Sequence, residues 1–180
     1  MPSPWREEPI LKPTADGSLT IFDPLSQSHF HSLHGAVGES LHVYIHGSCL
    51  PDRLNASSAN SGSLNILEIG LGTGLNLLLT AGWVAEARSK SSREPLVNYS
   101  AFEPRPLPAD VLKPYYQRIG FPHPQPDLSA VEAVIEAIAS QHSSLELPGI
   151  AADLRFKAWM CGLKELPIKH FDIIYYDPFG

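Results

Sequence analysis

Apolar positions along the second half of the chain alternate between two spacings. Runs of apolar or alternating residues predict buried strands at 64–69, 97–103, 154–160 and 171–176. Apolar residues at helical spacing predict helices at 74–88, 108–119 and 128–139. Strands that alternate with helices are typical of an α/β fold, with a mostly parallel sheet and helices on both of its faces.

The first 63 residues follow a less regular pattern, which predicts a small β-rich extension. Residues 10–11 and 19–23 suit a hairpin closed by the turn at Asp16-Gly17. Residues 41–46 fit either a strand or the end of a helix that begins near Gly38, and both alternatives stay open. Since residues 55–63 include no large side chain, they predict a flexible loop.

These patterns predict three parts of the chain: an N-terminal extension at 1–54, the flexible loop at 55–63 and a main domain at 64–180. The chain ends directly after the apolar strand predicted at 171–176. We therefore expect the main domain to be incomplete, because that strand would otherwise form an exposed apolar edge.

Composition narrows the class of protein. The formal net charge of −6 argues against a protein that binds nucleic acid by covering phosphates with basic residues. Two cysteines are too few for a disulfide framework, and we find no secretory signal, so a cytoplasmic location is expected. No apolar run approaches the roughly 20 residues that cross a membrane, and the sequence does not define the oligomeric state.

The segment 68–76, Glu-Ile-Gly-Leu-Gly-Thr-Gly-Leu-Asn, carries the main chemical signal. In parallel sheets a ligand binds beyond the carboxyl ends of the strands, where glycines permit a tight turn and a close approach. The third glycine, Gly74, comes one position too early for the dinucleotide fingerprint, and no Gly-Lys-Ser or Gly-Lys-Thr follows as in a phosphate loop. The spacing therefore favours a different nucleotide-like cofactor.

Two acidic residues stand where such a cofactor would need them. Glu103 ends the next strand, where a carboxylate can accept hydrogen bonds from ribose hydroxyls. Asp177 directly follows the last predicted strand, so we expect it at the same edge of the sheet as the glycine segment and Glu103.

The Glu-x-Gly-x-Gly-x-Gly pattern after a strand resembles motif I of class I S-adenosylmethionine-dependent methyltransferases. More of the chain resembles the methyltransferase domain of the MnmC family, and the matching segments are 14–18, 29–32, 34–35, 39–40, 68–76, 102–103, 159–166 and 177–179. The resemblance implies a Rossmann-like class I methyltransferase fold, S-adenosyl-L-methionine as the cofactor, and tRNA as the substrate. The methyl acceptor would be an aminomethyl group on the wobble uridine, in the modification 5-methylaminomethyl-2-thiouridine.

The resemblance also implies roles for individual residues. Those expected to bind the cofactor are Glu68, Gly70, Gly72, Thr73, Gly74, Asn76, Glu103, Gly162 and Asp177. Asp177 is also the expected catalytic residue, because a carboxylate can orient an amine and remove its proton. The residues expected on the substrate side are His34, Glu39 and Phe179.

Residues 159–162 depart from the family pattern. The family has Trp-x-Gly-Asp here, with the aspartate near the adenine, whereas Gly162 takes the aspartate's position in this chain. Adenine recognition would then depend on backbone groups and apolar stacking. Cys161 is expected to be a small buried apolar residue. The histidines at 29–46 lack a ligand cluster of known spacing, so no metal site is expected.

Alternative functions remain open. The chain could be a degenerate or truncated module that binds without turnover, or a methyltransferase that acts on a small molecule. Members of the family can be fused to a flavin-dependent oxidoreductase domain that acts on CH–NH groups. Nothing in the 180 residues matches that domain.

Overall fold

The computed structural model describes residues 5, 7–15, 17–31, 33–60, 62–91, 96–168 and 170–177. Its strands are β1 (Ile10–Pro13), β2 (Leu19–Asp23), β3 (Ser28–His29), β4 (Ser63–Ile69), β5 (Leu96–Phe102), β6 (Ser144–Leu147), β7 (Ile150–Arg155) and β8 (Ile173–Tyr176). Its helices are α1 (Ala36–Ser40), the π-helix η1 (Leu41–His46), α2 (Leu50–Asn60), α3 (Leu75–Lys90), α4 (Ala109–Arg118), α5 (Leu128–Ala139), α6 (Trp159–Gly162) and the 3₁₀ helix η2 (Leu163–Glu165). Among these helices none has the length and apolar character to cross a membrane.

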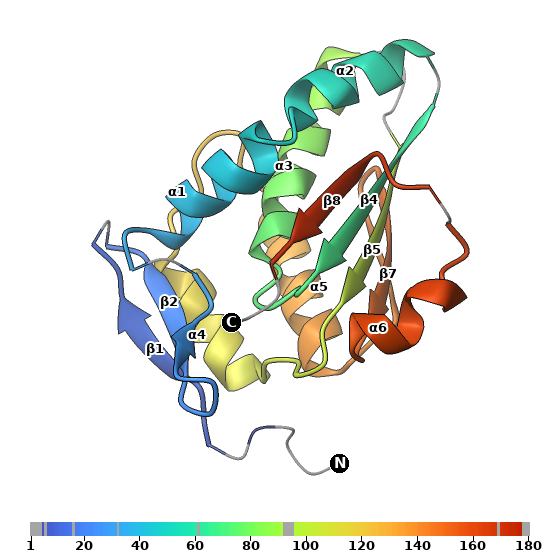
Figure 1. Cartoon of the computed structure of the whole chain (residues 1–180). Coiled ribbons are helices and arrows are strands. Elements are labelled where there is room, and N and C mark those ends of the chain that lie inside the picture. The colour runs from blue at the N-terminus through green and yellow to red at the C-terminus, as the bar shows by residue number, and fades with distance from the viewer. Residues whose placement is uncertain are drawn as a thin grey trace.

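The main sheet has the strand order β6-β7-β5-β4-β8, and Figure 1 shows β7, β5, β4 and β8 side by side. The pairs β4–β5, β4–β8 and β5–β7 are parallel, and only β6 runs antiparallel to its neighbour β7. The predicted α/β, Rossmann-like sheet is therefore confirmed, and the carboxyl ends of β4, β5 and β8 meet at one edge.

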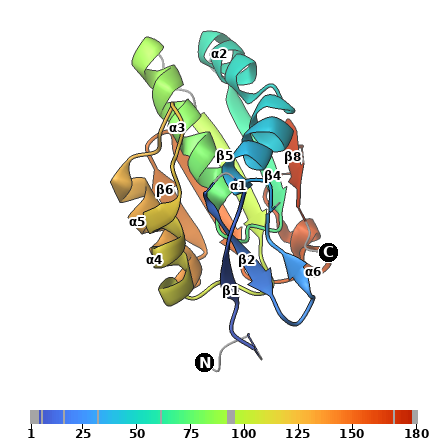
Figure 2. The same cartoon turned by 90° about the vertical axis from the view of Figure 1, so that its left-hand side faces the viewer.

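The two faces of the sheet follow from alternation along β4. Leu64 and Ile66 belong to the larger core, whereas Leu67 and Ile69 join a smaller cluster with Phe102. Figure 2 shows α3, α4 and α5 on one face of the sheet and α6 on the other. Glu68 lies in register with the residues that face α3, so a carboxyl group is placed inside the larger core.

The strand predicted at 154–160 is wrong in its bounds. β7 spans Ile150–Arg155, and the chain then turns into the short helix α6. The preceding strand β6 was not predicted. The two strands form a hairpin through Gly149, whose φ of 81° suits the turn, and the Pro148-Gly149 pair was the available turn signal.

The N-terminal extension forms a three-stranded antiparallel sheet of β1, β2 and β3. The predicted hairpin is confirmed, since Ile10 pairs with Phe22 and Leu11 with Ile21. Of the two alternatives for residues 41–46 the helical one is correct, because α1 continues directly into η1. Figure 1 shows this small sheet beside α4, near the carboxyl ends of β4 and β8.

The flexible loop predicted at 55–63 is wrong for residues 55–60, which form the end of α2. Leu50 and Leu54 are fully buried and lie one helical turn apart, so the helix has an apolar anchor upstream of the small polar residues. Leu50 and Leu54 lie before residue 55, so the composition of residues 55–63 alone did not reveal this anchor. Residue 61 lies outside the described residues, and β4 begins at Ser63.

Candidate functional site

The glycine loop, residues 70–74, connects the carboxyl end of β4 to the start of α3. Gly70, Gly72 and Gly74 have φ values of 92°, 53° and 80°, in the region that favours glycine. A Cβ atom on Gly74 would lie 2.7 Å from Cγ1 of Val134 in α5, so the loop also packs tightly against α5. The Gly70 N–H donates to the Phe102 carbonyl oxygen at 3.0 Å, which joins the loop to the end of β5.

Glu103 lies directly against this loop. Its Oε2 accepts from the Gly72 N–H and its Oε1 from the Arg105 N–H, both at 2.8 Å. Burial raises the pKa of Glu103 to about 7, although these two N–H groups and the Arg105 charge oppose the rise and the Asp177 charge adds to it. Glu103, the residue expected to bind the ribose, therefore lies at the glycine loop, where the order of the elements predicted it.

Glu68 and Asn76 form a buried pair beneath the loop. The Asn76 Nδ2 donates to Glu68 Oε1 at 2.9 Å, and the Tyr99 hydroxyl donates to Glu68 Oε2 at 2.8 Å. Burial raises the pKa of Glu68 to about 8. Asn76 Oδ1 is buried and accepts no hydrogen bond in the described structure, so this oxygen is available to a ligand of the loop.

Asp177 lies beside Gly70 because its N–H donates to the Ile69 carbonyl oxygen at 2.9 Å. Its carboxylate hydrogen-bonds the hydroxyl of Tyr44 in η1. Burial raises the pKa of Asp177 to about 6, the Tyr44 hydrogen bond opposes this, and the negative charge of Glu39 adds to it. Three carboxyl groups with raised pKa values, those of Glu68, Glu103 and Asp177, therefore surround the loop.

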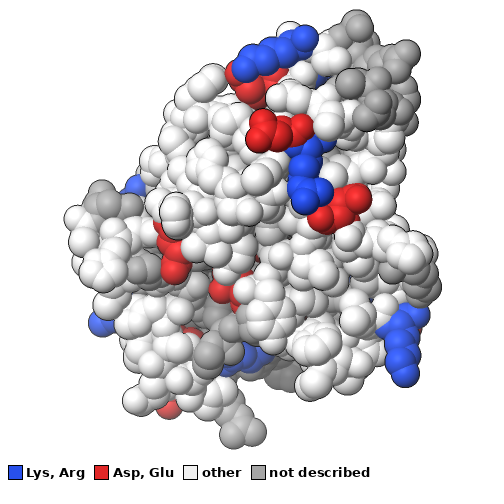
Figure 3. All heavy atoms as spheres, turned by 45° about the horizontal axis from the view of Figure 1, so that its top comes forward, with Lys and Arg blue, Asp and Glu red and all other residues white. Residues whose placement is uncertain are grey.

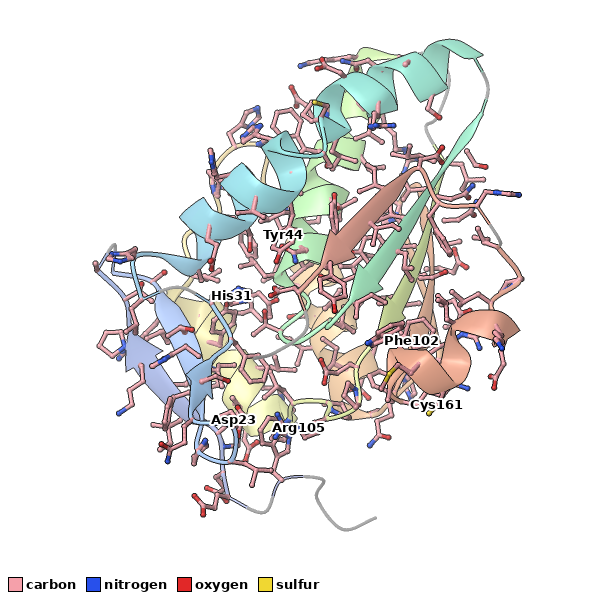
Figure 4. The ribbon with its side chains drawn as sticks, viewed as in Figure 1. Asp23, His31, Tyr44, Phe102, Arg105 and Cys161 are labelled. Atoms are coloured by element: carbon pink, nitrogen blue, oxygen red, sulfur yellow. The ribbon has the colours of Figure 1, made fainter. Side chains whose placement is uncertain are left out.

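The N-terminal extension contributes a histidine to the same loop. Nε2 of His31 lies 3.3 Å from Oγ1 of Thr73, and both side chains are buried. On the opposite side the Tyr116 hydroxyl of α4 donates to the Thr73 carbonyl oxygen at 2.8 Å. Figure 4 shows His31 and Tyr44 extending from the N-terminal half of the chain toward the carboxyl ends of the strands. The sequence singled out His31 only among the histidines weighed for a metal site, and it indicated no role for Tyr44 or Tyr116.

Arg105 fastens this extension to the segment that follows Glu103. Its Nη2 lies 2.6 Å from Oδ2 of Asp23, which is almost fully buried at the end of β2. Its guanidinium group lies 4.8 Å from the centre of the Trp5 ring. The small sheet is thus held at the site by the ion pair between Asp23 and Arg105 (Figure 4), and the cation–π contact holds Trp5 beside it.

A cavity of about 260 Å³ opens at the glycine loop, on the α6 face of the sheet. Its lining residues are Ile69, Gly70, Phe102, Pro104, Arg105, Ala158, Trp159 and Met160. Larger hollows, of about 570 Å³ between α4 and α5 and about 460 Å³ beside the end of β7, have no lining residue from the loop.

Gly162 is not among the residues that line this cavity. A Cβ atom at Gly162 would lie 2.5 Å from the Phe102 ring and 2.6 Å from the Lys157 side chain, so the position is closed by packing. The start of α6, Trp159 and Met160, lines the cavity instead. The expectation that Cys161 is buried is wrong, because its side chain is exposed on α6 (Figure 4).

The three residues expected on the substrate side lie in different settings. His34 is exposed in the turn before α1, and Glu39 is half-buried within α1. Phe179 lies outside the described residues. Within the described part of the chain no group of three or more His, Cys, Asp or Glu side chains is arranged to hold a metal ion.

Figure 3 shows acidic and basic side chains interspersed over one face of the molecule. The basic side chains visible there do not form a continuous patch. This distribution agrees with the acidic composition, and no strong phosphate-binding surface is evident on that face.

The chain is similar in sequence to curated proteins that share one description. The chain is 30% identical over 131 residues to the tRNA 5-methylaminomethyl-2-thiouridine biosynthesis bifunctional protein MnmC of Burkholderia thailandensis, covering 73% of this chain and 18% of that protein. The Paraburkholderia xenovorans protein of the same description is 31% identical over 98 residues, which is 54% of this chain and 14% of that protein. The Burkholderia mallei protein is 40% identical over 68 residues, 37% of this chain and 10% of that protein.

Among solved structures, MNMC2 from Aquifex aeolicus matches with a TM-score of 0.68 and 19% identity, over 99% of this chain and 52% of that one. This similarity supports the fold. No protein-family model matches the chain. The chain thus spans less than a fifth of the length of these curated relatives.

Proposed function

Since this chain is MnmC-like in sequence over most of its length, we propose that it is an S-adenosylmethionine-dependent N-methyltransferase domain that acts on a wobble-uridine aminomethyl group in tRNA. The relatives named above are tRNA-modification proteins by description, which supports tRNA as the substrate. The reaction would be the final methylation that gives 5-methylaminomethyl-2-thiouridine.

The observation that carries the proposal is the convergence of Glu103 and Asp177 on the glycine loop. Glu103 binds the Gly72 N–H, and the backbone of Asp177 is bonded to the residue that precedes Gly70. Residues more than 70 positions apart in the sequence are thus held around one turn at the carboxyl ends of β4, β5 and β8. This is where open α/β sheets bind their ligands.

The residues present fit the proposed cofactor. S-adenosylmethionine supplies an activated methyl group on a positively charged sulfonium. The carboxylate of Asp177, ionised at neutral pH, favours a cation at this position, and Glu103 adds to this as it ionises. The unpartnered Asn76 Oδ1 offers a further acceptor, and the cavity lined by Trp159 and Met160 offers an apolar surface for an adenine ring.

In this proposal the protein acts mostly by positioning. An amine attacks only in its neutral form and in line with the bond that breaks, so the acceptor must be held and deprotonated. Asp177 is suited to accept a hydrogen bond from the amine and then its proton. Because the pKa of Asp177 is raised to about 6, its carboxylate is a stronger base than an exposed aspartate and is still ionised at neutral pH.

The test is methyl transfer from labelled S-adenosylmethionine to tRNA that lacks only the final methyl, with fully modified tRNA as the blank. We expect the 180-residue chain to label the first tRNA only. Asp177→Asn should lose turnover while it still binds S-adenosylmethionine, more weakly because one carboxylate charge near the sulfonium is removed. Asp110→Asn, exposed on α4, serves as the matched control. Transfer that is equal to both tRNAs, or absent from both, would contradict the proposal.

Two other functions give different results in the same assay. A module without turnover would bind S-adenosylmethionine and label neither tRNA. A small-molecule methyltransferase would label a small amine and leave both tRNAs unlabelled.

A further inference from the structure

A π-helical turn lies between α1 and α2, at η1. Such turns are rare and frequently occur at functional sites. Here the Gly47 N–H donates to the His42 carbonyl oxygen at 3.1 Å, a bond that spans five residues. Glu39 at the end of α1 lies close enough for its charge to act on both Tyr44 and Asp177, so Glu39 and Tyr44 face the same region.

Tyr44 contacts two residues of the last strand region. Its hydroxyl hydrogen-bonds the Asp177 carboxylate. Its ring lies edge-on to that of Tyr175, with 5.5 Å between the ring centres. Tyr175 pairs with Glu68 across β4 and β8, so Tyr44 is packed against the strands that form the site. Figure 4 shows Tyr44 between η1 and the end of β8.

We propose that Tyr44 is a positioning residue for Asp177, which holds one carboxylate oxygen so that the other faces the methyl acceptor. This inference rests on the proposed function only in naming the acceptor as an amine. The bond is donated by the Tyr44 hydroxyl to a carboxylate oxygen, and a charge-assisted bond of this kind fixes both distance and direction. Without this bond the orientation of the carboxyl group is not fixed by Tyr44.

Tyr44 itself does not take the proton. Burial, followed by the negative charge of Asp177 and the hydrogen bond to it, raises the pKa of Tyr44 well above its usual value. The hydroxyl therefore stays protonated and acts as a donor throughout. The amine nitrogen gives up one proton, and the free oxygen of Asp177 receives it.

The groups that face Asp177 come from four elements: Tyr44 from η1, Glu39 from α1, Glu68 from β4 and Glu103 after β5. Tyr44 and Glu39 act on Asp177 in opposite directions. The hydrogen bond from Tyr44 favours the ionised carboxylate, whereas the negative charge of Glu39 disfavours it. Removal of each should move the Asp177 titration in opposite directions, which a purely structural role of Tyr44 would not produce.

The test is a ¹³C NMR titration of the aspartate carboxyl groups in the 180-residue chain, with the Asp177 signal assigned by Asp177→Asn. We expect Tyr44→Phe to raise the titration midpoint of Asp177 and Glu39→Gln to lower it, while Tyr176→Phe, on the exposed side of β8, leaves it unchanged. A midpoint that stays fixed or falls in Tyr44→Phe would overturn the proposal. Should Tyr44→Phe not fold, the ¹³Cζ signal of Tyr44 in the wild-type chain serves instead: it should change with pH at the Asp177 midpoint, and a Tyr44 signal that does not change there overturns the proposal.

This titration requires neither S-adenosylmethionine nor tRNA, so it distinguishes the role of Tyr44 from the proposed function. A second measurement joins the two. In the methyl-transfer assay Tyr44→Phe should lower kcat, leave KM for S-adenosylmethionine unchanged and move the acid limb of the pH–rate profile upward. A loss confined to KM would contradict a role at the acceptor.

Discussion

Nε2 of His31 lies 3.3 Å from Oγ1 of Thr73, so a residue of the N-terminal extension meets the glycine loop directly. The Thr73 hydroxyl already accepts from the Leu75 N–H at 3.3 Å, which leaves its proton for His31. Burial lowers the pKa of His31 to about 4, so the ring is neutral at pH 7 and one ring nitrogen can accept. The extension is therefore part of the site.

Removal of either partner should weaken binding of S-adenosylmethionine. We expect His31→Phe and Thr73→Val each to raise Kd about fivefold, the effect of one hydrogen bond. Since both changes remove the same bond, the double variant should be no weaker than the weaker single variant. Calorimetry on the wild-type chain, the two single variants and the double variant completes this double-mutant cycle.

The matched control is His29→Phe, because the His29 ring packs against Phe22 and is two residues from His31. His29→Phe should bind S-adenosylmethionine as the wild-type chain does. Additive losses in the double variant would show that His31 and Thr73 act separately.

Gly74→Ala should destabilise the fold by about 2–4 kcal/mol, since the left-handed backbone and the contact with Val134 both oppose a Cβ atom. Gly38→Ala is the control, because a Cβ atom there meets nothing within 4 Å and α1 gains a better helix former. Urea unfolding compares the two variants. Equal stability would mean that Gly74 is not fixed by this packing.

Glu68 should make the fold less stable as pH rises. Its pKa is about 8 in the folded chain and close to 4.5 when unfolded, so the folded state holds its proton where the unfolded state has lost it. Unfolding free energy should therefore fall between about pH 5 and about pH 8, with Glu103 and Asp177 acting in the same direction.

Glu68→Gln should reduce this fall, and Glu146→Gln, at an exposed position of β6, should not. Urea unfolding at about pH 5 and at about pH 8 measures the fall in unfolding free energy for each variant. If Glu68→Gln keeps the full pH dependence, Glu68 is not the protonated group.

The three carboxyl groups should also make cofactor binding depend on pH. As they ionise between about pH 6 and about pH 8, the sulfonium of S-adenosylmethionine gains attraction that the uncharged sulfur of S-adenosylhomocysteine lacks. We expect the ratio of the two affinities to shift several-fold toward S-adenosylmethionine over that range. A constant ratio would place the sulfonium away from these groups.

The sequence predicted the parts of the fold that have strong local patterns. The strand at 64–69, the glycine turn and the helix that follows were predicted almost to the residue, because three adjacent signals agree. α2 was missed because its stability comes from Leu50 and Leu54 packing, which the small residues after them do not reveal. β6 was too short to show a period.

The site was predictable where residues end strands. Glu103 and Asp177 could be placed from strand order alone, because parallel strands end at one edge. His31 and Tyr44 could not, since their positions depend on how the N-terminal sheet and the π turn pack against the main domain. Long-range packing of this kind has no local signal.

The central claim is that the glycine loop binds S-adenosylmethionine, and isothermal titration calorimetry tests it most directly. The wild-type chain should bind at a single site, and so should Gly120→Arg, where the added side chain meets open space. Gly72→Arg should abolish binding, because Gly72 has a φ of 53° and bonds Glu103. Absence of binding by the wild-type chain, or equal binding by Gly72→Arg, would contradict the claim.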